Sequence, residues 1–501
     1  MLEKMNYRSF LAKPLAKYLI LKTIKDHINP VDCQQTIFEH LINTAKNTQF
    51  GKDHYFNKIK TIADFRKAVP VKDYENIKPY VEQIFKGKQN VLWPGLPVYF
   101  AKTSGTTSGS KFIPITKASI PNHINTARNA LMSYVYYTGK ANFLDGNMMF
   151  LSGSPILDNG SLIPTGRLSG IVNHHIPKVL KTNQLPSWAT NCIENWDDKV
   201  QKIVEETRNS DLRLISGIPP WVQMYLDKIN EQTGKPINEV FPNLQLFVHG
   251  GVNYRPYKNK LETSFNKAMD TIETFPASEG FFAYQDKQDE DGLLLNINSG
   301  IFFEFIPLDE FYNDNPTRLS VADVELNINY ALVISSNAGL WAYSIGDTVK
   351  FVNKKPLRLV VSGRVKHFIS AFGEHVIGEE VDRAISLAAK QFKATINEFT
   401  VAPMVNPVNE LPYHEWCIEF ETEPEYLKKF ALCIDEQLQQ QNSYYKDLIV
   451  GKVLQPLKIT LIKKGGFNQY MESIGKLGGQ NKLPRLTNNR KLVDVLLNLN
   501  V

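Results

Sequence analysis

Residues Thr103 to Lys111 form the segment whose composition is best suited to holding an anion. The run reads TSGTTSGSK, in which hydroxyl side chains surround Gly105 and Gly109 and a lysine closes the segment. Glycines let backbone N–H groups approach phosphate oxygens, hydroxyls donate further hydrogen bonds, and the lysine adds positive charge. The Walker spacing fails, because Ser110 precedes the lysine. We therefore expect either a flexible phosphate-binding loop of another type or a solvated surface loop.

Together with Phe100, this run fits the phosphate-loop signature of the adenylate-forming enzymes, and three further segments resemble other motifs of that superfamily, in the right order. FPASE at 275–279 resembles the aromatic-x-x-Thr-Glu motif, and YSIGD at 343–347 resembles the Tyr-x-x-Gly-Asp motif. The Gly-Arg pair at 363–364, followed by Lys366, resembles the hinge. Each segment alone would be read as a surface carboxylate, a turn or a strand end. Four matches in order argue against coincidence.

The resemblance implies a role for each nucleotide-binding residue. The residues implied to hold the phosphates are Ser104, Gly105, Thr106, Thr107 and Lys111. Phe275 would stack on adenine, and Ser278 keeps the hydroxyl of the threonine that it replaces. Glu279 would act in catalysis by holding Mg²⁺.

The resemblance also implies residues for the ribose, the hinge and the reaction itself. Asp347 would bind the ribose hydroxyls, Arg364 would reach the nucleotide, and Lys366 would be the pivot. Lys482, in GGQNKLPR at 478–485, matches a catalytic lysine that bridges the acyl carboxylate and the α-phosphate in the first step. Because the surrounding tail is basic, a solvated lysine is the alternative reading of Lys482.

Longer strings narrow the resemblance to one family. VPVKDYENIKPYVEQIFKG at 69–87 and HGGVNYRPY at 249–257, with the motifs above, are similar to the Gretchen Hagen family of auxin-responsive acyl-acid amido synthetases, best known from plants. The similarity covers nearly the whole chain, and we expect a member from outside plants. It implies a ligase that uses ATP and Mg²⁺ to convert a carboxylic acid into an acyl-adenylate, releasing pyrophosphate. An amino acid or another amine would then displace AMP and form an amide.

Two alternatives stay open at this stage. An acyl-CoA ligase would share the adenylation step, although Ser370 stands where such ligases commonly carry a lysine. A catalytically silent nucleotide-binding member of the family is the second alternative. No Cys–His or Ser–His–Asp nucleophile stands out in the sequence, so covalent catalysis by the protein is not predicted.

The acyl-acid pocket is the part of the site that the sequence describes least. Its candidate lining residues are Trp221, Gly250, Gly251 and Tyr254. The helix residue among them could equally be core packing, and His249 is best read as a structural histidine. We expect a small carboxylic acid and an amine as partners, with no nucleic acid and no membrane. Neither the acid nor the oligomeric state follows from the sequence.

Composition excludes several classes of protein. The 501 residues include 57 Lys+Arg and 51 Asp+Glu, so the net charge of +6 is too dilute for a nucleic-acid footprint. The four cysteines (Cys33, Cys192, Cys417 and Cys433) lie far apart and predict neither a disulfide framework nor a zinc site. Lysines interrupt the apolar N-terminal stretch, which argues for a surface helix instead of a signal peptide. We therefore expect a cytoplasmic protein.

The elements that must position these residues suggest an α/β fold of two domains. Between about 199 and 298, short apolar runs alternate with helical stretches, which is typical of a layered α/β domain. A strand-rich, barrel-like subdomain follows at about 300–362. We predict an N-terminal adenylation domain at 1–362 and a mobile C-terminal α+β domain at 363–501, with the site in the cleft between them.

Overall fold

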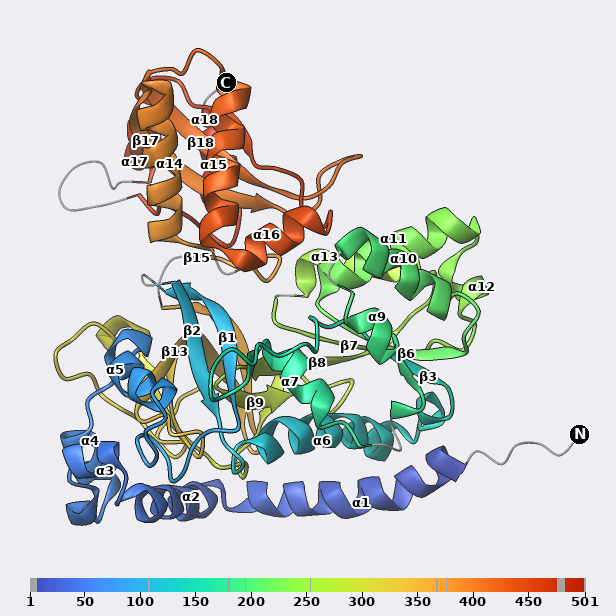
Figure 1. The fold of residues 1–501 in the computed structure, drawn as a ribbon, viewed down its shortest axis with the longest axis vertical. Coiled ribbons are helices and arrows are strands. Elements are labelled where there is room, and N and C mark those ends of the chain that lie inside the picture. The colour runs from blue at the N-terminus through green and yellow to red at the C-terminus, as the bar shows by residue number, and fades with distance from the viewer. Residues whose placement is uncertain are drawn as a thin grey trace, which may run out of the picture.

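The computed structural model describes residues 7–106, 109–177, 181–193, 195–252, 254–365, 368–374, 376–474 and 483–499. A large N-terminal α/β domain carries a smaller C-terminal α+β domain above it (Figure 1). The fold class predicted from the sequence is confirmed. Within the described residues, no helix combines the length and apolarity that crossing a membrane requires.

An eleven-stranded sheet runs through the N-terminal domain in the order β11-β12-β13-β14-β10-β9-β8-β7-β6-β3-β5. Its parallel half consists of β3 (Asn147–Phe150), β5 (Gln184–Leu185), β6 (Leu212–Ser216), β7 (Leu246–Gly250) and β8 (Asp270–Ala277). Leu246 packs with α1 (Tyr7–Ile28) and α6 (Ile120–Thr138), whereas its neighbour Phe247 packs toward the other face. The helices on that other face are α10 (Trp196–Thr207), α11 (Pro219–Thr233) and α13 (Arg255–Phe265). Because successive side chains point to opposite faces, strands covered on both sides have continuous apolar runs.

The antiparallel half of the same sheet contains the strand-rich block. Its strands are β9 (Gly280–Tyr284), β10 (Leu293–Leu295), β11 (Ile301–Pro307), β12 (Asn329–Ser336), β13 (Tyr343–Lys354) and β14 (Leu357–Arg364). The block is thus continuous with the parallel strands and ends at β11, instead of closing into the barrel-like subdomain that the sequence suggested. Helix α2 (Pro30–Ala45) lies against this edge, where the Gln34 amide donates to the carbonyls of Ile297 (2.8 Å) and Ile301 (3.0 Å).

A smaller sheet carries the predicted phosphate-binding segment. It has the order β2-β1-β4, formed by β1 (Tyr99–Thr106), β2 (Gly109–Ile115) and β4 (Thr165–Gly166). Helix α5 (Tyr74–Phe85) packs on it, with Phe85 stacked on Phe100 at 4.3 Å between ring centroids. Short helices connect the remaining parts: α3 (Gln49–Asp53), α4 (Ile62–Ala68), α7 (Leu168–His174), α9 (Trp188–Asn191) and α12 (Ile237–Val240).

The C-terminal domain is built on a three-stranded sheet of order β17-β18-β19. Its strands are β17 (Thr395–Met404), β18 (Tyr413–Thr422) and β19 (Lys458–Leu461). Val401 packs toward α14 (Gly378–Phe392) and α15 (Leu427–Gln441), while Ala402 packs toward α17 (Gly466–Ser473) and α18 (Lys491–Leu499). A two-stranded ribbon of β15 (Phe368–Ile369) and β16 (Val376–Ile377) precedes α14, and α16 (Ser443–Val450) follows α15.

The two domains touch at two places. At one, Arg167 forms an ion pair with Asp447 of α16, and the Tyr444 hydroxyl donates to the Lys102 carbonyl at 3.4 Å. At the other, the Tyr257 hydroxyl of α13 donates to the Ala371 carbonyl at 2.6 Å. The N-terminal and C-terminal cores therefore merge beside α13, where Phe247 and Phe372 belong to one apolar cluster.

Candidate active site

The predicted phosphate loop is largely a β-hairpin. Thr103 pairs with Lys111 and Thr106 pairs with Gly109, so β1 and β2 extend through most of the segment that we expected to be a flexible loop. The threonines of this run favour extended backbone, although its glycines do not. Ser104, Gly105 and Thr106 thus have strand backbone. Their side chains, and Thr107 as a whole, lie outside the described residues.

Glu279 sits in the tight turn between β8 and β9, and it is 8% exposed. The Tyr343 hydroxyl, at the start of β13, donates to Glu279 Oε1 at 3.4 Å. Burial, reinforced by the Glu279 charge, holds the pKa of Tyr343 well above its usual range, so the phenol keeps its proton. The proton on Tyr343 helps to fix the orientation of the Glu279 carboxylate, a contact that the sequence analysis did not predict.

Asp347 and Arg364 face each other across neighbouring strands. Their backbones are paired in the antiparallel register of β13 and β14, and the guanidinium forms an ion pair with the Asp347 carboxylate. The Val365 N–H donates to the Gly346 carbonyl at 2.9 Å, which continues this ladder beyond β14. Gly346 has φ of +87°, a left-handed backbone that favours glycine and lets the chain bend directly before Asp347.

Lys111 completes a group of four charged side chains from distant parts of the chain. Burial lowers the pKa of Lys111, while the carboxylates of Glu279 and Asp347 oppose that shift and Arg364 adds to it. Burial likewise raises the pKa of Asp347, and Arg364 opposes the change. Two cations and two carboxylates thus interact in a shielded site, where their fields are stronger than in water. Such a site suits a ligand with several anionic groups and a bound cation.

The proposed adenine residue lies beside this group. Phe275, at the end of β8, is 7% exposed and meets Phe282 edge to face at 5.2 Å. Its ring is therefore mostly part of the core here, and stacking on a base stays a prediction. Ser278 is half-buried in the same turn as Glu279.

The candidate acyl-pocket residues lie on β7 and the helices above it. Gly250 pairs with Thr274, and a Cβ added to it would meet the Thr274 carbonyl oxygen at 2.4 Å, so only glycine fits this approach to β8. Gly251 follows with φ of +80°. Trp221 and Tyr254 pack against the apolar cluster shared with the C-terminal domain. Their role in binding an acid stays a prediction.

Lys366 and Lys482 lie outside the described residues, but the chain on the C-terminal side of Lys482 is well anchored. Pro484 accepts a hydrogen bond from the Thr400 hydroxyl at 2.8 Å. Arg485 accepts one from the Val401 N–H at 3.0 Å and forms an ion pair with Glu398. The segment that follows Lys482 is therefore fixed along the edge of β17.

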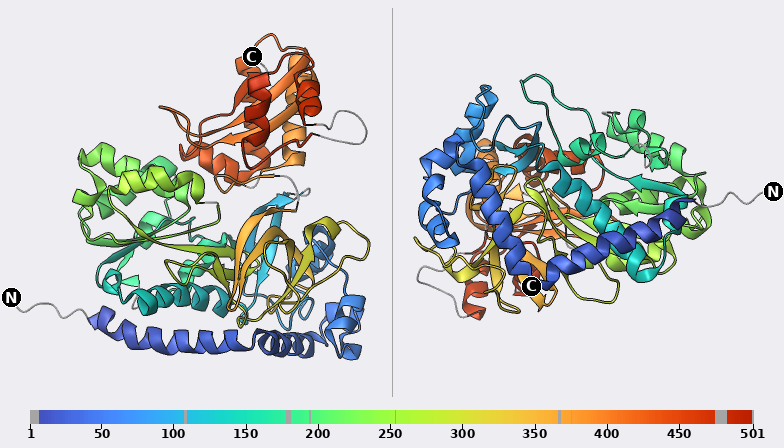
Figure 2. Two further views of the ribbon diagram at one scale, coloured as in Figure 1. Left: turned by 180° about the vertical axis from the view of Figure 1, so that it is seen from behind. Right: turned by 90° about the horizontal axis from the view of Figure 1, so that it is seen from below.

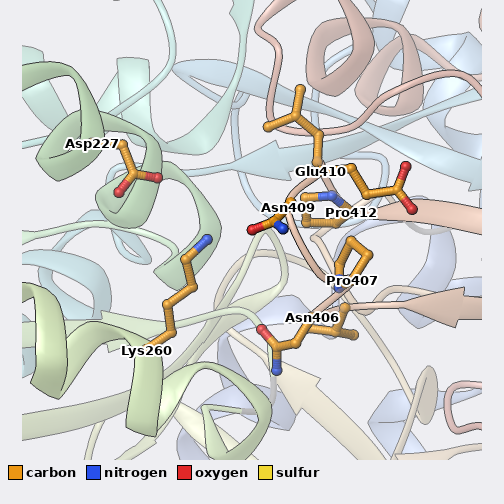
Figure 3. A pocket seen from close by; sticks show the side chains of 9 residues that line it. Asp227, Lys260, Asn406, Pro407, Asn409, Glu410 and Pro412 are labelled. Carbon is orange, nitrogen blue, oxygen red and sulfur yellow. The ribbon is translucent and has the colours of Figure 1, made fainter. Parts of the chain in front are cut away.

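Two cavities were not anticipated from the sequence. A groove of about 470 Å³ lies between the domains, with Asp227 and Lys260 on one side and the β17–β18 loop (405–412) on the other (Figure 3). A second cavity of about 10 Å³ lies beyond β2, with a lining made of Ile115, Ile120, His123, Ile124, Leu168, Ile171, Val172 and His175. Burial lowers the pKa of His123 to about 4, so this lining is uncharged at neutral pH. Neither cavity contains a residue of the charged group.

Three domain models of one protein family match the chain. The GH3 family N-terminal domain matches residues 21–171, the GH3 family central domain matches 294–364, and the GH3 family C-terminal domain matches 379–491. The chain belongs to the GH3 family. This confirms the Gretchen Hagen resemblance, and the three matches fall in the order expected of one continuous family member.

Curated GH3 relatives are similar over nearly the full length. The chain is 22% identical to an indole-3-acetic acid-amido synthetase of Arabidopsis thaliana, over 95% of this chain and 93% of the relative. It is 22% identical to a 4-substituted benzoates-glutamate ligase of the same plant, over 95% and 96%. A jasmonoyl-L-amino acid synthetase of Nicotiana attenuata is 21% identical, with 90% of each chain covered. These names describe amide-forming ligases with different acids.

Solved structures show the same fold. The GH3.15 acyl acid amido synthetase superposes with a TM-score of 0.60 at 15% identity, covering 96% of this chain and 95% of that one. A 2-hydroxyisobutyryl-CoA ligase in its thioesterification state gives 0.60 at 12% identity, covering 93% and 92%. The same ligase in its postadenylation state, with the adenylate bound, gives 0.50, at 12% identity and 93% and 91% coverage.

Proposed function

We propose that this GH3 protein uses ATP and Mg²⁺ to activate a carboxylic acid as an acyl-adenylate and then transfers the acyl group to the amine of an amino acid. The observation that carries the proposal is the meeting of Lys111, Glu279, Asp347 and Arg364 in one shielded site. These side chains come from four separate segments, and each occupies a motif position of the adenylate-forming enzymes.

The first half-reaction brings two anions together. An oxygen of the acid attacks the α-phosphorus, and the bond from that phosphorus to pyrophosphate breaks. Lys111 and Arg364 offset the repulsion between the carboxylate and the triphosphate, and their positions are set before the substrates arrive. The ion pair with Asp347 holds the Arg364 guanidinium in place. The Asp347 carboxylate would then lie beside the bound nucleotide and accept hydrogen bonds from the ribose hydroxyls.

The donor set fits magnesium brought in with the nucleotide. Within the described ranges, no group of three or more His, Cys, Asp and Glu side chains is arranged to hold a metal ion. Mg²⁺ is commonly held by one or two carboxylates together with substrate phosphates and water. Glu279, oriented by Tyr343, is the carboxylate that would hold it. The ion would supply positive charge to the leaving pyrophosphate.

The second half-reaction needs a different position of the C-terminal domain. The amine must approach the acyl carbon so that the carbon–oxygen bond to AMP breaks as the amide forms. We assign the present domain arrangement to this step, because the superposition is better on the thioesterification state than on the postadenylation state of the CoA ligase. Rotation about Lys366 would bring Lys482 to the site for the first step. Lys482→Ala should therefore slow adenylation but spare transfer from a supplied acyl-adenylate.

Acid-dependent ATP–pyrophosphate exchange over a library of carboxylic acids tests the proposal. Exchange should appear with at least one acid and should be lost in Glu279→Ala, while Glu262→Ala on the exposed side of α13 should keep it. Adding amino acids or coenzyme A to an active acid then separates an amido synthetase from an acyl-CoA ligase. If no acid supports exchange, the protein is not an adenylating enzyme, and if Glu279→Ala exchanges normally, this carboxylate is not in the site.

A further inference from the structure

Helix α1 exposes an apolar face on the side that points away from the protein. Ala12, Ala16 and Ile20 are buried against α6. At 100° per residue, the opposite side of the helix carries an apolar stripe of large and strongly exposed side chains. The stripe consists of Phe10 (75% exposed), Leu11 (63%), Leu15 (47%), Tyr18 (68%), Leu21 (48%) and Ile28 (69%). Soluble proteins seldom leave so many large apolar side chains exposed on one helix face, so this stripe calls for an occupant.

The charged residues of α1 indicate which kind of partner could cover the apolar stripe. Lys13, Lys17, Lys22 and Lys25 are all exposed, and they flank or interrupt the apolar stripe. Asp26 is the only acidic side chain between Tyr7 and Ile28, and it is half-buried. A second copy of the chain would place lysines against lysines, whereas an anionic surface would be attracted. Aromatic and aliphatic side chains interspersed with lysines on one exposed face suit an anionic membrane interface, because lysine stems can lie along apolar groups while their ammonium groups reach lipid headgroups.

The position of α1 in the fold leaves the stripe accessible along its whole length. Figure 1 shows α1 and α2 along the edge of the molecule farthest from the C-terminal domain, and Figure 2 shows α1 in front when the molecule is seen from below. Its 22 residues span about 33 Å, long enough for a broad flat contact. Residues 7–20 also precede the range that the GH3 family N-terminal domain matches, so that match does not account for them.

We propose that α1 docks this protein on the surface of an anionic lipid bilayer, lying flat in the interface. The apolar stripe would sit at the boundary between headgroups and acyl chains, and the lysines would lie among the lipid phosphates and carboxylates. This revises the expectation, drawn from the sequence, that the protein has no membrane partner. The active site and the C-terminal domain would face away from the bilayer, so that domain rotation stays unhindered. The proposal does not depend on which reaction the protein catalyses.

Cosedimentation of the full chain with vesicles tests the docking. The chain should bind vesicles of phosphatidylcholine and phosphatidylserine, bind vesicles of phosphatidylcholine alone far more weakly, and lose anionic binding as salt rises. Replacing two stripe residues in Phe10→Ser/Leu11→Ser should weaken binding about tenfold or more. Reversing two charges in Lys13→Glu/Lys17→Glu should also cost about tenfold or more.

Control variants in the C-terminal domain show whether vesicle binding depends on α1 itself or only on the net charge and apolar content of the whole surface. Leu432→Ser removes an exposed leucine from α15, and Lys428→Glu/Lys429→Glu makes the same change in net charge on that helix. Both should bind anionic vesicles as the unaltered chain does, and circular dichroism should show that every variant is folded. Absence of binding at every phosphatidylserine content would overturn the proposal, as would equal losses in the α15 variants. Sedimentation velocity supplies a further test, because a dimer that Phe10→Ser/Leu11→Ser dissociates would assign the stripe to a second copy.

Discussion

Replacing His249 with phenylalanine should remove part of the acid sensitivity of the fold. His249 lies at the end of β7, is 3% exposed, and stacks on Tyr254 with 4.2 Å between ring centroids. Neither ring nitrogen has a hydrogen-bond partner in the described part of the chain. Burial therefore lowers the pKa of His249 from 6.5 to about 3, and the imidazole stays neutral in the folded protein.

The magnitude follows from the difference between the folded and unfolded states. Between pH 6.5 and about 3 the unfolded chain binds a proton at this position and the folded protein does not, so the free energy of unfolding falls as pH falls. Each pH unit below 6.5 costs about 1.4 kcal/mol, so the group contributes about 2 kcal/mol of lost stability between pH 7.5 and pH 5. His249→Phe should lose about 2 kcal/mol less than the unaltered chain over this interval. Both buried nitrogens disappear in the variant, and no hydrogen bond is broken.

Urea unfolding at pH 7.5 and pH 5 measures this difference. The comparison uses the change with pH and not the absolute stability, so a packing cost of the larger ring cancels. His40→Phe, on the exposed side of α2, controls for the loss of a histidine elsewhere and should keep the full pH dependence. If His249→Phe shows the same loss of stability as the unaltered chain, His249 is either charged or solvated in the folded protein, and the reasoning fails.

Two further predictions concern the charged site. Asp347→Ala should raise the KM for ATP about 30-fold or more, because charge-assisted hydrogen bonds to the nucleotide are lost, and should change the KM for the acid little. Steady-state kinetics measure both constants, and equal increases would indicate that Asp347 has a structural role instead. Because burial lowers the pKa of Lys111, ATP binding measured by calorimetry should weaken with rising pH before an ordinary lysine would titrate. Between the lowered pKa of Lys111 in the folded protein and its ordinary value in the unfolded chain, only the unfolded chain keeps the lysine proton. The free energy of unfolding should therefore rise with pH over this interval. Lys111→Met should abolish both trends, and their persistence would show that another group titrates.

Much of the fold was predictable because it depends on local periodicity. The short and mostly apolar runs at residues 212–216 and 244–248 indicated strands of a layered α/β domain, and they correspond to β6 and β7. The continuity of the two half-sheets was missed, since it depends on β8 pairing with β9 and β10 with β14, and no local pattern encodes that choice. The predicted loop at 103–111 was wrong in part because composition did not reveal its strand pairing.

The site was predictable in its residue types but not in its contacts. The motifs gave Lys111, Glu279 and Asp347, yet the ion pair of Asp347 with Arg364 depends on the register of β13 and β14. The contact of Tyr343 with Glu279 depends on how a turn after β8 meets the start of β13. Such long-range geometry is set by tertiary packing, which a single sequence does not display.

Detection of an amide product would distinguish an amido synthetase from an acyl-CoA ligase and from a silent nucleotide-binding protein. The full chain would be incubated with Mg-ATP, each acid that supports pyrophosphate exchange and the twenty amino acids, and the mixture analysed by mass spectrometry. We expect an acyl-amino acid, formed together with equal amounts of AMP and pyrophosphate, and no such product with Glu279→Ala. Formation of an acyl-CoA in place of any amide when coenzyme A is supplied, or release of ADP and phosphate instead of AMP and pyrophosphate, would contradict this expectation.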